Sequence, residues 1–340
     1  MGFGPVSSQK LEQLVENVNT ALSVLGTSNK LIYPRLCFVD DGSQTDGTPI
    51  GEKVAEIRNG DGITGEKIRY PFSPVSNAPK RWPAGVPREE RDAIIQVIEV
   101  TRHRHAPADE RIYYDFQDVW GILNGKTKEI IQRGGLLWDL ELVRALHANA
   151  VGFDGKPFFA ADHPVDPNDP SKGTQSNTIA ITAMDDTGLA AALDVFAGMK
   201  WFDGITRNSE MEKPTLLVPT ASLNIKARQL VFGSLIPTTG NAAVATGSNG
   251  LEGLVQDVIF SPLLADGTTD ANKYCYLISP GTPVRAGLIC SPKRAPEFHI
   301  AGLNPNEEIR RKYSAYAYGW DAFGCVETGL YHDVVRIKVG

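Results

Sequence analysis

The sequence predicts an α+β fold, and two observations lead to that class. One continuous helical pattern runs from Phe116 to Asn149, and several strand-like segments follow it towards the C-terminus. In the helical pattern, apolar residues recur at i, i+3, i+4 and i+7, which places them on one face of a helix. A helix of that length spans roughly 50 Å at 1.5 Å per residue. Because few small globular domains need so long a helix, we expect it to act as a strut.

Four glycines interrupt this predicted helix, namely Gly121, Gly125, Gly134 and Gly135. Each costs about 1 kcal/mol relative to Ala, so either packing along the apolar face holds the helix or the helix bends. We expect the bend at Gly134 and Gly135, which makes these two residues hinge candidates. The alternative is a two-helix hairpin broken at the same pair. The glycine- and proline-containing segment 152–157 is typical of the region after a helix C-terminus.

Length and composition restrict the class of protein. The 340 residues suffice for two domains, and the apolar and charged fractions are those of an ordinary soluble protein. No run of 18 apolar residues occurs, so no membrane partner is expected. The four cysteines are scattered without a Cys-x-x-Cys pair, which gives no sign of a zinc site or a disulfide framework. The formal charge of −6 leaves weak, non-specific contact as the only expected interaction with DNA.

The N-terminal part is expected to hold one helix and one strand. Residues 7–25 open with a Ser N-cap signal and place their apolar residues on one face, which predicts an amphipathic helix that needs a partner surface. Residues 31–39 are predicted to form a strand at a sheet edge, because Pro34 cannot donate a ladder hydrogen bond. The Gly-x-Gly-x-x-Gly match ending at Gly65 precedes a strand rather than a helix, so it predicts a hairpin turn and no dinucleotide site.

An arm of two strands is predicted next. Lys67–Tyr70 and Ala93–Arg102 have strand character, and five prolines between 71 and 87 make the connecting segment extended. A two-stranded ribbon is not stable alone in water, so we expect it to lie on a partner. The candidate intersubunit contacts are Phe72, Lys80, Arg81, Trp82 and Arg88. The alternative is an ordinary surface loop with Trp82 packed into the chain's own core.

The second half alternates helices and strands. Asp185 is expected to cap a helix that ends near Trp201, and a second helix is predicted over Ala221–Phe232. The segment 237–250 is predicted to be a loop. The predicted strands are Thr215–Val218, Val255–Phe260, Tyr274–Ile278, Val284–Ile289, Glu297–Ala301, Tyr313–Tyr318 and Val334–Val339. We expect the last of them to pack with the long helix.

Catalytic motifs are missing from the sequence. It contains neither a Gly-x-Ser-x-Gly motif nor a Walker loop, so neither an enzyme nor a cofactor is predicted. The strongest metal-like cluster comprises Asp162, His163, Asp166 and Asp169. Oxygen ligands on a loop would suit calcium, whereas the interleaved prolines and the missing Asp-x-Asp-x-Asp-Gly spacing favour turn chemistry.

The segments Asp154–Pro164, Leu216–Leu230 and Tyr313–Trp320, taken in order, resemble the major head (capsid) subunit of Mu-like tailed phages and prophages. The first runs from Asp154 to Pro164 and is followed by Ser176-Asn177; its motif residues are Asp154, Gly155, Phe158, Phe159, His163 and Pro164. The second is Leu216-Leu217-Val218-Pro219 followed by Ala227-Arg228-Gln229-Leu230. The third is the aromatic ending Tyr313-Ser-Ala-Tyr-Ala-Tyr-Gly-Trp320. Together they cover the chain from about Ile112 to the C-terminus.

The resemblance implies the Hong Kong 97-type phage capsid fold. Its parts are an N-terminal arm, an extended E-loop, a peripheral domain built on a long spine helix, and an axial domain. On this chain they correspond to an arm over 1–50, an E-loop and its strands over 51–111, a peripheral domain over 112–150 and 297–340, and an axial domain over 151–296.

The function implied by the resemblance is that of a major capsid protein of a tailed bacteriophage. It implies self-assembly into hexamers and pentamers of an icosahedral shell around double-stranded DNA. The implied partners are further copies of the chain, a portal, a scaffold and decoration proteins, and the implied location is the virion, after assembly in the host cytoplasm. Two alternatives stay open: an encapsulin-type compartment shell with the same fold, and a metal-assisted hydrolase with its site at Asp162, His163 and Asp166.

Overall fold

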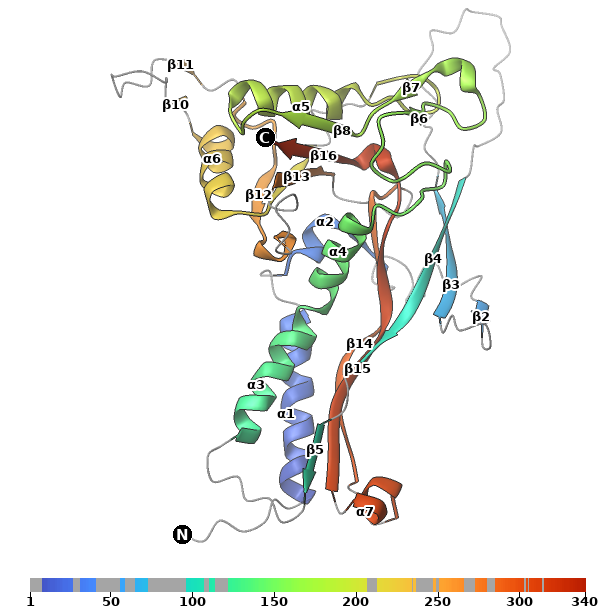
Figure 1. The fold of residues 1–340 in the computed structure, drawn as a ribbon, viewed down its shortest axis with the longest axis vertical. Coiled ribbons are helices and arrows are strands. Elements are labelled where there is room, and N and C mark those ends of the chain that lie inside the picture. The colour runs from blue at the N-terminus through green and yellow to red at the C-terminus, as the bar shows by residue number, and fades with distance from the viewer. Residues whose placement is uncertain are drawn as a thin grey trace, which may run out of the picture.

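The chain forms an elongated α+β molecule, as predicted (Figure 1). A computed structural model describes residues 8–26, 31–40, 56–58, 65–72, 96–106, 110–113, 122–206, 213–233, 235–236, 247–248, 251–265, 273–279, 285–302, 304, 306–313 and 315–340. A long lower body of helices and a β-ribbon carries an upper domain that contains the C-terminal strand. A β-hairpin branches from the side of the ribbon.

The lower body is organised around one sheet, to which seven strands of the described part belong. They are β1 (Phe38–Val39), β2 (Glu56–Arg58), β3 (Gly65–Phe72), β4 (Gln96–His105), β5 (Glu110–Tyr113), β14 (Leu288–Ala301) and β15 (Ala315–Thr328). The antiparallel pair β14 and β15 forms the long ribbon, and a short helix, α7 (Glu308–Tyr313), lies between them in the chain.

The strand predictions over the ribbon are wrong in their extent. Val284–Ile289 and Glu297–Ala301 were expected to be two strands, and β14 instead runs unbroken from Leu288 to Ala301. The ladder shifts register between Pro292 and Arg294 and again between Arg294 and Glu297. Such bulges leave residues unpaired, and this allows prolines to stay inside a strand. The expected strand at Tyr313–Tyr318 likewise starts two residues later and continues to Thr328.

The amphipathic N-terminal helix is confirmed as α1 (Ser8–Gly26). Leu11, Val18 and Leu22 are buried, and Val18 and Leu22 pack in one cluster with Phe298 and other residues of the ribbon. The amide of Asn19 extends this contact, because it donates to the Phe298 carbonyl at 3.2 Å and accepts from the Phe298 N–H at 2.7 Å. A side chain on α1 thus pairs the backbone edge of β14 at this position.

The predicted strand over 31–39 is wrong for its first seven residues. Residues 33–36 form one helical turn, α2 (Tyr33–Leu36), and only Phe38–Val39 is a strand. Pro34 lies in the first turn of α2, where its fixed φ is favourable and its missing N–H costs nothing. The Asp139 carboxylate accepts from the backbone N–H of Ile32 and Tyr33, which completes the cap from a distant helix.

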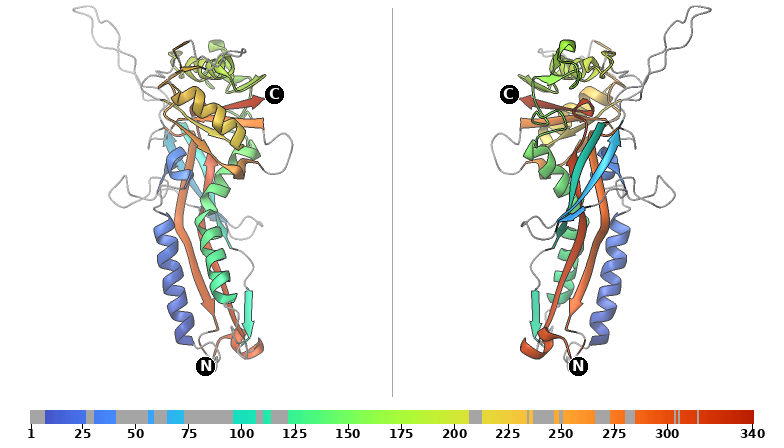
Figure 2. Two further views of the ribbon diagram at one scale, coloured as in Figure 1. Left: turned by 90° about the vertical axis from the view of Figure 1, so that its left-hand side faces the viewer. Right: turned by 90° about the vertical axis from the view of Figure 1, so that its right-hand side faces the viewer.

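The long helix is two helices in series, α3 (Ile122–Gly135) and α4 (Leu137–Ala148). Leu136 between them has φ −91° and ψ 0°. Helical hydrogen bonds continue through the break, from Leu136 N–H to the Gln132 carbonyl at 3.2 Å and from Leu140 N–H to the Leu136 carbonyl at 3.0 Å. The two helices follow one another along the molecule, so the hairpin alternative is not formed (Figures 1 and 2). Residues 116–121 of the predicted helix lie outside the described residues.

The upper domain is built on a second sheet in the order β12-β9-β13-β16-β8. Its strands are β8 (Thr178–Ile181), β9 (Thr215–Val218), β12 (Asp257–Phe260), β13 (Tyr274–Ile278) and β16 (Val334–Val339). Two helices, α5 (Asp186–Gly198) and α6 (Ala221–Phe232), share one core cluster with this sheet. Helix α6 and strands β9, β13 and β16 lie where the sequence predicts them, and α5 ends at Gly198, three residues before the expected Trp201.

The placement of β16 corrects the expected domain boundary. Residues 297–340 were expected to belong together with the long helix. Instead, β16 pairs antiparallel with β13 and parallel with β8, inside the upper sheet. The ribbon, in turn, begins at Leu288 rather than at residue 297. The chain therefore enters the upper domain twice, and its last strand closes that domain's sheet.

The predicted arm strands are present as the β3–β4 hairpin. They pair antiparallel from Gly65 opposite His103 to Phe72 opposite Gln96, and β4 continues to His105, three residues beyond the predicted end. β2 pairs antiparallel with β3, in agreement with a hairpin turn near Gly65, although residues 59–64 are outside the described residues. The same holds for the proline-rich segment 73–95 and for most of the predicted loop 237–250.

Short elements complete the described part. They are β6 (His163–Pro164), η2 (Pro170–Lys172), β7 (Thr174–Gln175), β10 (Leu235–Ile236), β11 (Gly247–Ser248), η3 (Pro262–Leu264) and η5 (Tyr331–Asp333). A core cluster that includes Trp138, Leu142, Leu146, Tyr276 and Tyr331 joins α4 to the ribbon and to the upper sheet. This cluster places the loop after α4 at the junction of the two bodies.

Candidate functional site

The loop that follows α4 is held by its own backbone geometry. Asn149 ends the helix in the left-handed region at φ 47°, a conformation that Asn tolerates better than most residues. Its side-chain oxygen accepts from the Phe159 N–H at 2.6 Å. Gly155 also has a positive φ, 76°, which favours glycine at this motif position. The loop therefore doubles back on itself directly after the helix.

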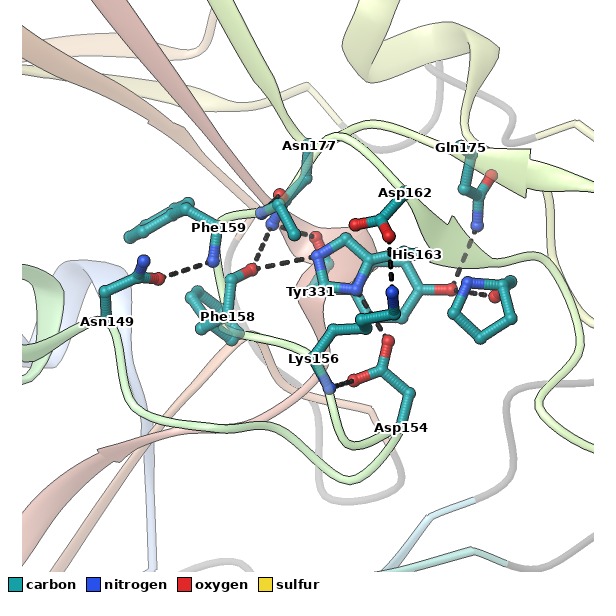
Figure 3. A network of polar contacts seen from close by, with 12 residues as sticks. Asn149, Asp154, Lys156, Phe158, Phe159, Asp162, His163, Gln175, Asn177 and Tyr331 are labelled. Atoms are coloured by element: carbon teal, nitrogen blue, oxygen red, sulfur yellow. Dashed lines mark hydrogen bonds and ion pairs between the residues drawn. The ribbon is translucent and has the colours of Figure 1, made fainter.

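A buried carboxylate–imidazole pair stands at the centre of the loop (Figure 3). His163 Nδ1 lies 2.6 Å from Asp154 Oδ2, and the two side chains are 1% and 0% exposed. His163 Nε2 faces the Phe158 carbonyl at 3.2 Å. Both ring nitrogens thus face oxygen atoms, and these two contacts fix the orientation of the ring. The other Asp154 oxygen accepts from the Lys156 N–H at 3.1 Å.

His163 also belongs to a stack of aromatic rings. Tyr331 lies parallel to it with ring centroids 3.8 Å apart, and His332 stacks on Tyr331 at 3.9 Å. Trp201 follows at 5.0 Å from His332, and the Arg285 guanidinium lies 4.7 Å above the Trp201 ring. The stack connects four segments that are far apart in the sequence.

Tyr331 is the polar centre of that stack. Its hydroxyl donates to the Pro164 carbonyl at 2.7 Å and accepts from the Gln175 amide at 3.1 Å. Burial, more than any other cause, raises the pKa of Tyr331, so the hydroxyl stays a neutral donor. Neither Tyr331 nor Gln175 was predicted from the sequence, because neither lies in a motif and the contact between them spans 156 residues.

The remaining motif residues pack in the core or bind the backbone of the loop. Phe158 and Phe159 are buried in the core cluster beneath the upper sheet. The Arg336 guanidinium of β16 lies 4.7 Å above the Phe159 ring, which joins the C-terminal strand to the motif. Asn177 donates to the Phe158 carbonyl at 2.6 Å and accepts from the Ala160 N–H at 3.0 Å. The motif segment Asp154–Pro164 therefore connects α4 to the upper sheet, and we call this buried connection the joint.

The acidic residues of the metal-like cluster turn to different partners. Asp162 is exposed and pairs with Lys156, which lowers the pKa of the Asp162 carboxyl. Asp166 pairs with Lys172 at 2.8 Å, and Asp169 accepts from the Ser171 N–H at 3.1 Å. Among the residues that the structure describes, no three His, Cys, Asp or Glu side chains converge on a metal-sized site. The geometry does not favour the hydrolase alternative.

A second buried polar cluster lies where the arm hairpin joins the ribbon. Arg102 is fully buried on β4; it donates to Ser291 Oγ at 2.8 Å and lies 3.4 Å from Glu66 on β3. The Tyr70 hydroxyl contacts the same Ser291 oxygen at 2.6 Å and donates to Asp40 at 2.7 Å. This cluster was not predicted from the sequence. A charged residue at an inward position of an alternating strand, such as Arg102, can indicate a buried ion pair.

The other candidate residues lie in two places. Gly134 and Gly135 line a cavity of about 530 Å³ between α1, the helix break and the bulged part of β14. A Cβ at Gly134 would lie 3.1 Å from Leu22, so α1 approaches the helix break closely there. Phe72 is the last residue of β3, while Lys80, Arg81, Trp82 and Arg88 lie outside the described residues. In the described part, no helix is both long and apolar enough to cross a membrane.

Comparisons with known proteins find similarity in structure alone. No protein-family model matches the chain, and no curated protein matches it in sequence. The capsid of bacteriophage JBD30 matches with 11% identity over 79% of this chain and 59% of that one, at a TM-score of 0.43. This chain therefore spans about three fifths of that capsid chain.

Two further solved structures are similar at the same level. The procapsid of bacteriophage JBD30 matches with 13% identity over 98% of this chain and 77% of that one, at a TM-score of 0.46. The capsid of a native GTA particle matches with 9% identity over 88% of this chain and 98% of that one, at a TM-score of 0.47.

Proposed function

We propose that the chain is the major capsid protein of a tailed bacteriophage, with a Hong Kong 97-type fold and no enzymatic activity. The observation that carries the proposal is the junction. The segment that resembles the phage head motif folds into a buried joint, in which Asp154, His163 and Tyr331 connect a long, broken helix to a separate sheet domain. Asp154 binds His163, and the Tyr331 hydroxyl binds Pro164 and Gln175, and this structural use of the polar groups suits a shell subunit.

The parts of the described molecule support the same proposal. The broken helix α3–α4 corresponds to a spine, the upper domain to an axial domain, and the β3–β4 hairpin to the base of an E-loop. The domain limits then become an N-terminal arm over 1–50, an E-loop over 51–111, a peripheral domain over 112–150 and about 288–328, and an axial domain over 151–287 and 329–340. Residues 329–340 are assigned to the axial domain because β16 pairs with β13 and β8 in the upper sheet.

Self-association is the proposed activity. Copies of the chain would form hexamers and pentamers of an icosahedral shell around double-stranded DNA, in the virion. A portal, a scaffold and decoration proteins are proposed as further partners, and the net charge of −6 supports only weak contact with DNA. We also propose Gly134 and Gly135 as a hinge of the spine, since the helix breaks beside them and a cavity adjoins them.

Electron microscopy of the purified chain, expressed alone or with its scaffold, tests the proposal. We expect capsomers or closed shells. A chain that stays monomeric at high concentration, with and without scaffold, would contradict the proposal. Shells that form in host cells and contain protein cargo but no DNA would instead support the encapsulin-type alternative.

A further inference from the structure

The outer face of α6 carries an apolar and basic stripe without cover in the described part of the chain. Ile225 is 58% exposed and Phe232 is 47% exposed, although both are large apolar residues. They lie seven residues apart and therefore on the same face of the helix. The Arg228 guanidinium lies 5.3 Å above the Phe232 ring and also donates to the Val258 carbonyl at 3.4 Å. Lys226 is exposed on the opposite flank of the same outer face, because residues one or two positions apart do not lie above one another on a helix. We call Ile225, Lys226, Arg228 and Phe232 the α6 stripe.

The inner face of α6 explains why the stripe is free for a partner. Ala227, Leu230 and Val231 are buried against the upper sheet, so the helix is already anchored. The two apolar residues of the stripe add nothing to that core. In the left view of Figure 2, α6 (gold) runs along the near surface of the upper domain. Exposed aromatic and Arg side chains on an anchored helix are typical of the residues that dominate protein interfaces.

A concave pocket with apolar and acidic lining lies elsewhere on the same domain. It has a volume of about 450 Å³ and lies between α5 and the turn at residues 252–254. Leu193, Phe196, Pro214 and Leu254 contribute apolar lining, and Leu254 is itself 43% exposed. We call this the α5 pocket.

The charges at the α5 pocket complement those of the α6 stripe. Asp194 and Glu252 line it together with one cation, Lys213, so carboxylates outnumber ammonium groups there. Both acidic side chains are exposed, and neither forms an ion pair with another described residue. The α6 stripe carries two cations, Lys226 and Arg228. The α6 stripe is therefore apolar and positively charged, and the α5 pocket is apolar and negatively charged, so the two surfaces are complementary.

We propose that the α6 stripe of one copy docks into the α5 pocket of a second copy of this chain, with Phe232 as the anchor. The proposal deepens the proposed shell function and rests on it. Each copy presents one stripe and one pocket, so the contact is head-to-tail. A head-to-tail contact closes into a ring when its rotation divides a full turn, and this is the geometry a capsomer requires.

Two charge-reversed variants test the contact. The stripe variant carries Lys226→Glu and Arg228→Glu, so that both its stripe and its pocket are acidic. The pocket variant carries Asp194→Lys and Glu252→Lys, so that both are basic. All four positions are exposed, and circular dichroism with thermal unfolding should show that both variants fold like the parent chain. Lys200→Glu, at another exposed position of the same domain, is the control for reversing a charge outside the contact.

We expect each variant alone to lose capsomers, with the assembled fraction lowered by roughly tenfold or more, because like charges then face each other. An equimolar mixture should regain assembly, since the stripe of each variant meets the pocket of the other. Alternation of two species closes only rings with an even number of members, so native mass spectrometry should find mixed hexamers and no mixed pentamers. The Lys200→Glu control should assemble like the parent chain.

The outcomes separate this contact from the general function. If the parent chain forms no capsomers, the proposed function fails and the contact fails with it. If the parent chain and both charge-reversed variants assemble equally well, only the contact is overturned. If both variants fail to assemble and their mixture also fails, the pairing of stripe with pocket is overturned. Phe232→Ser provides a charge-independent check, because loss of the anchor should weaken assembly without changing the thermal midpoint of the monomer.

Discussion

His163 Nδ1 lies 2.6 Å from Asp154 Oδ2, inside a joint where neither side chain is more than 1% exposed. A buried pair contributes little net stability, because both groups give up hydrogen bonds to water when the chain folds. Loss of one partner, however, leaves the other polar group buried without its hydrogen bond. Because Asp154 and His163 lie in one loop, the pair fixes the conformation of the segment that follows α4.

Asp154→Ala should lower the free energy of unfolding by about 3–5 kcal/mol, since it leaves His163 without its carboxylate. Urea unfolding followed by intrinsic fluorescence measures the change. Asp162→Ala is the matched control in the same loop, because Asp162 is exposed and pairs only with Lys156. We expect its unfolding midpoint to be unchanged. Equal effects of the two substitutions would contradict the structural role of the buried pair.

Asp139 predicts a pH effect with a defined sign. Burial, as the largest cause, raises the pKa of Asp139 above its ordinary value of 3.8, although the N–H groups of Tyr33 and Ile32 act in the opposite direction. The folded chain therefore binds this proton more tightly than the unfolded chain does. The contribution of Asp139 to stability is full below pH 3.8 and is lost as the pH rises through the folded-state pKa.

Asp139→Asn removes this titration and keeps an acceptor for the Tyr33 N–H, which Asp139 binds at 2.8 Å. We expect the variant's stability to depend less on pH in the range just above 3.8 than that of the parent chain. Asp139→Ala should instead cost about 1–3 kcal/mol at neutral pH, because the N–H groups that cap α2 lose their acceptor. Unfolding curves at a series of pH values distinguish the two. Parallel pH profiles for the parent chain and Asp139→Asn would refute the predicted titration.

Substitution of Arg102 tests whether its buried pair with Glu66 stabilises the base of the arm hairpin. Arg102→Met should cost roughly 3–5 kcal/mol, because Glu66 remains buried while its cross-strand partner is removed. Lys293, at 2.8 Å from Glu66, offsets part of that cost. Arg104→Met on the same strand is the control, since the Arg104 side chain is 63% exposed and its pair with Asp321 is at the surface. Its cost should stay below about 1 kcal/mol. Hydrogen exchange along β3 and β4 would show whether the loss is local to the hairpin.

Replacing Gly324 or Gly198 by Ala should change the free energy of unfolding in opposite directions, because the two glycines have different surroundings. A Cβ at Gly324 would lie 2.6 Å from the Trp138 ring and 2.8 Å from the Ser291 carbonyl, so Gly324→Ala should destabilise the contact between α4 and the ribbon by about 1–3 kcal/mol. Gly198, at the end of α5, has nothing within 4 Å of its Cβ position. Gly198→Ala should be neutral or stabilise by up to about 1 kcal/mol. Thermal unfolding measures both changes, and the same sign for both would contradict the packing described.

The arm is tested by the combined substitution Arg81→Ala and Trp82→Ala. If this segment overlaps a neighbouring copy, capsomers or shells should fail to form while the monomer keeps its secondary structure. Electron microscopy and circular dichroism of the same sample provide the two measurements. Normal shells from this variant would remove the assignment of Phe72, Lys80, Arg81, Trp82 and Arg88 as intersubunit contacts.

The sequence alone determined those elements whose signals lie within a few residues of one another. Helices α1, α5 and α6 follow from N-cap residues and helical periodicity, and β9, β13 and β16 follow from short apolar runs. The loop from Asp154 to Pro164 was also recognisable as a motif. Each of these signals is local, because a cap, a turn or one amphipathic face depends on immediate neighbours.

Only the tertiary structure decided which elements meet. β16 belongs to the upper sheet because Val334 pairs with Ile278, and β14 is one strand because its bulges accommodate two prolines. Tyr33 became helical because Asp139, 106 residues away, accepts its N–H. His163 lies against Tyr331, and Arg102 is buried beside Ser291. Strand register, ring stacking and the burial of a charge depend on residues distant in the chain, and no local pattern encodes which of them will be neighbours.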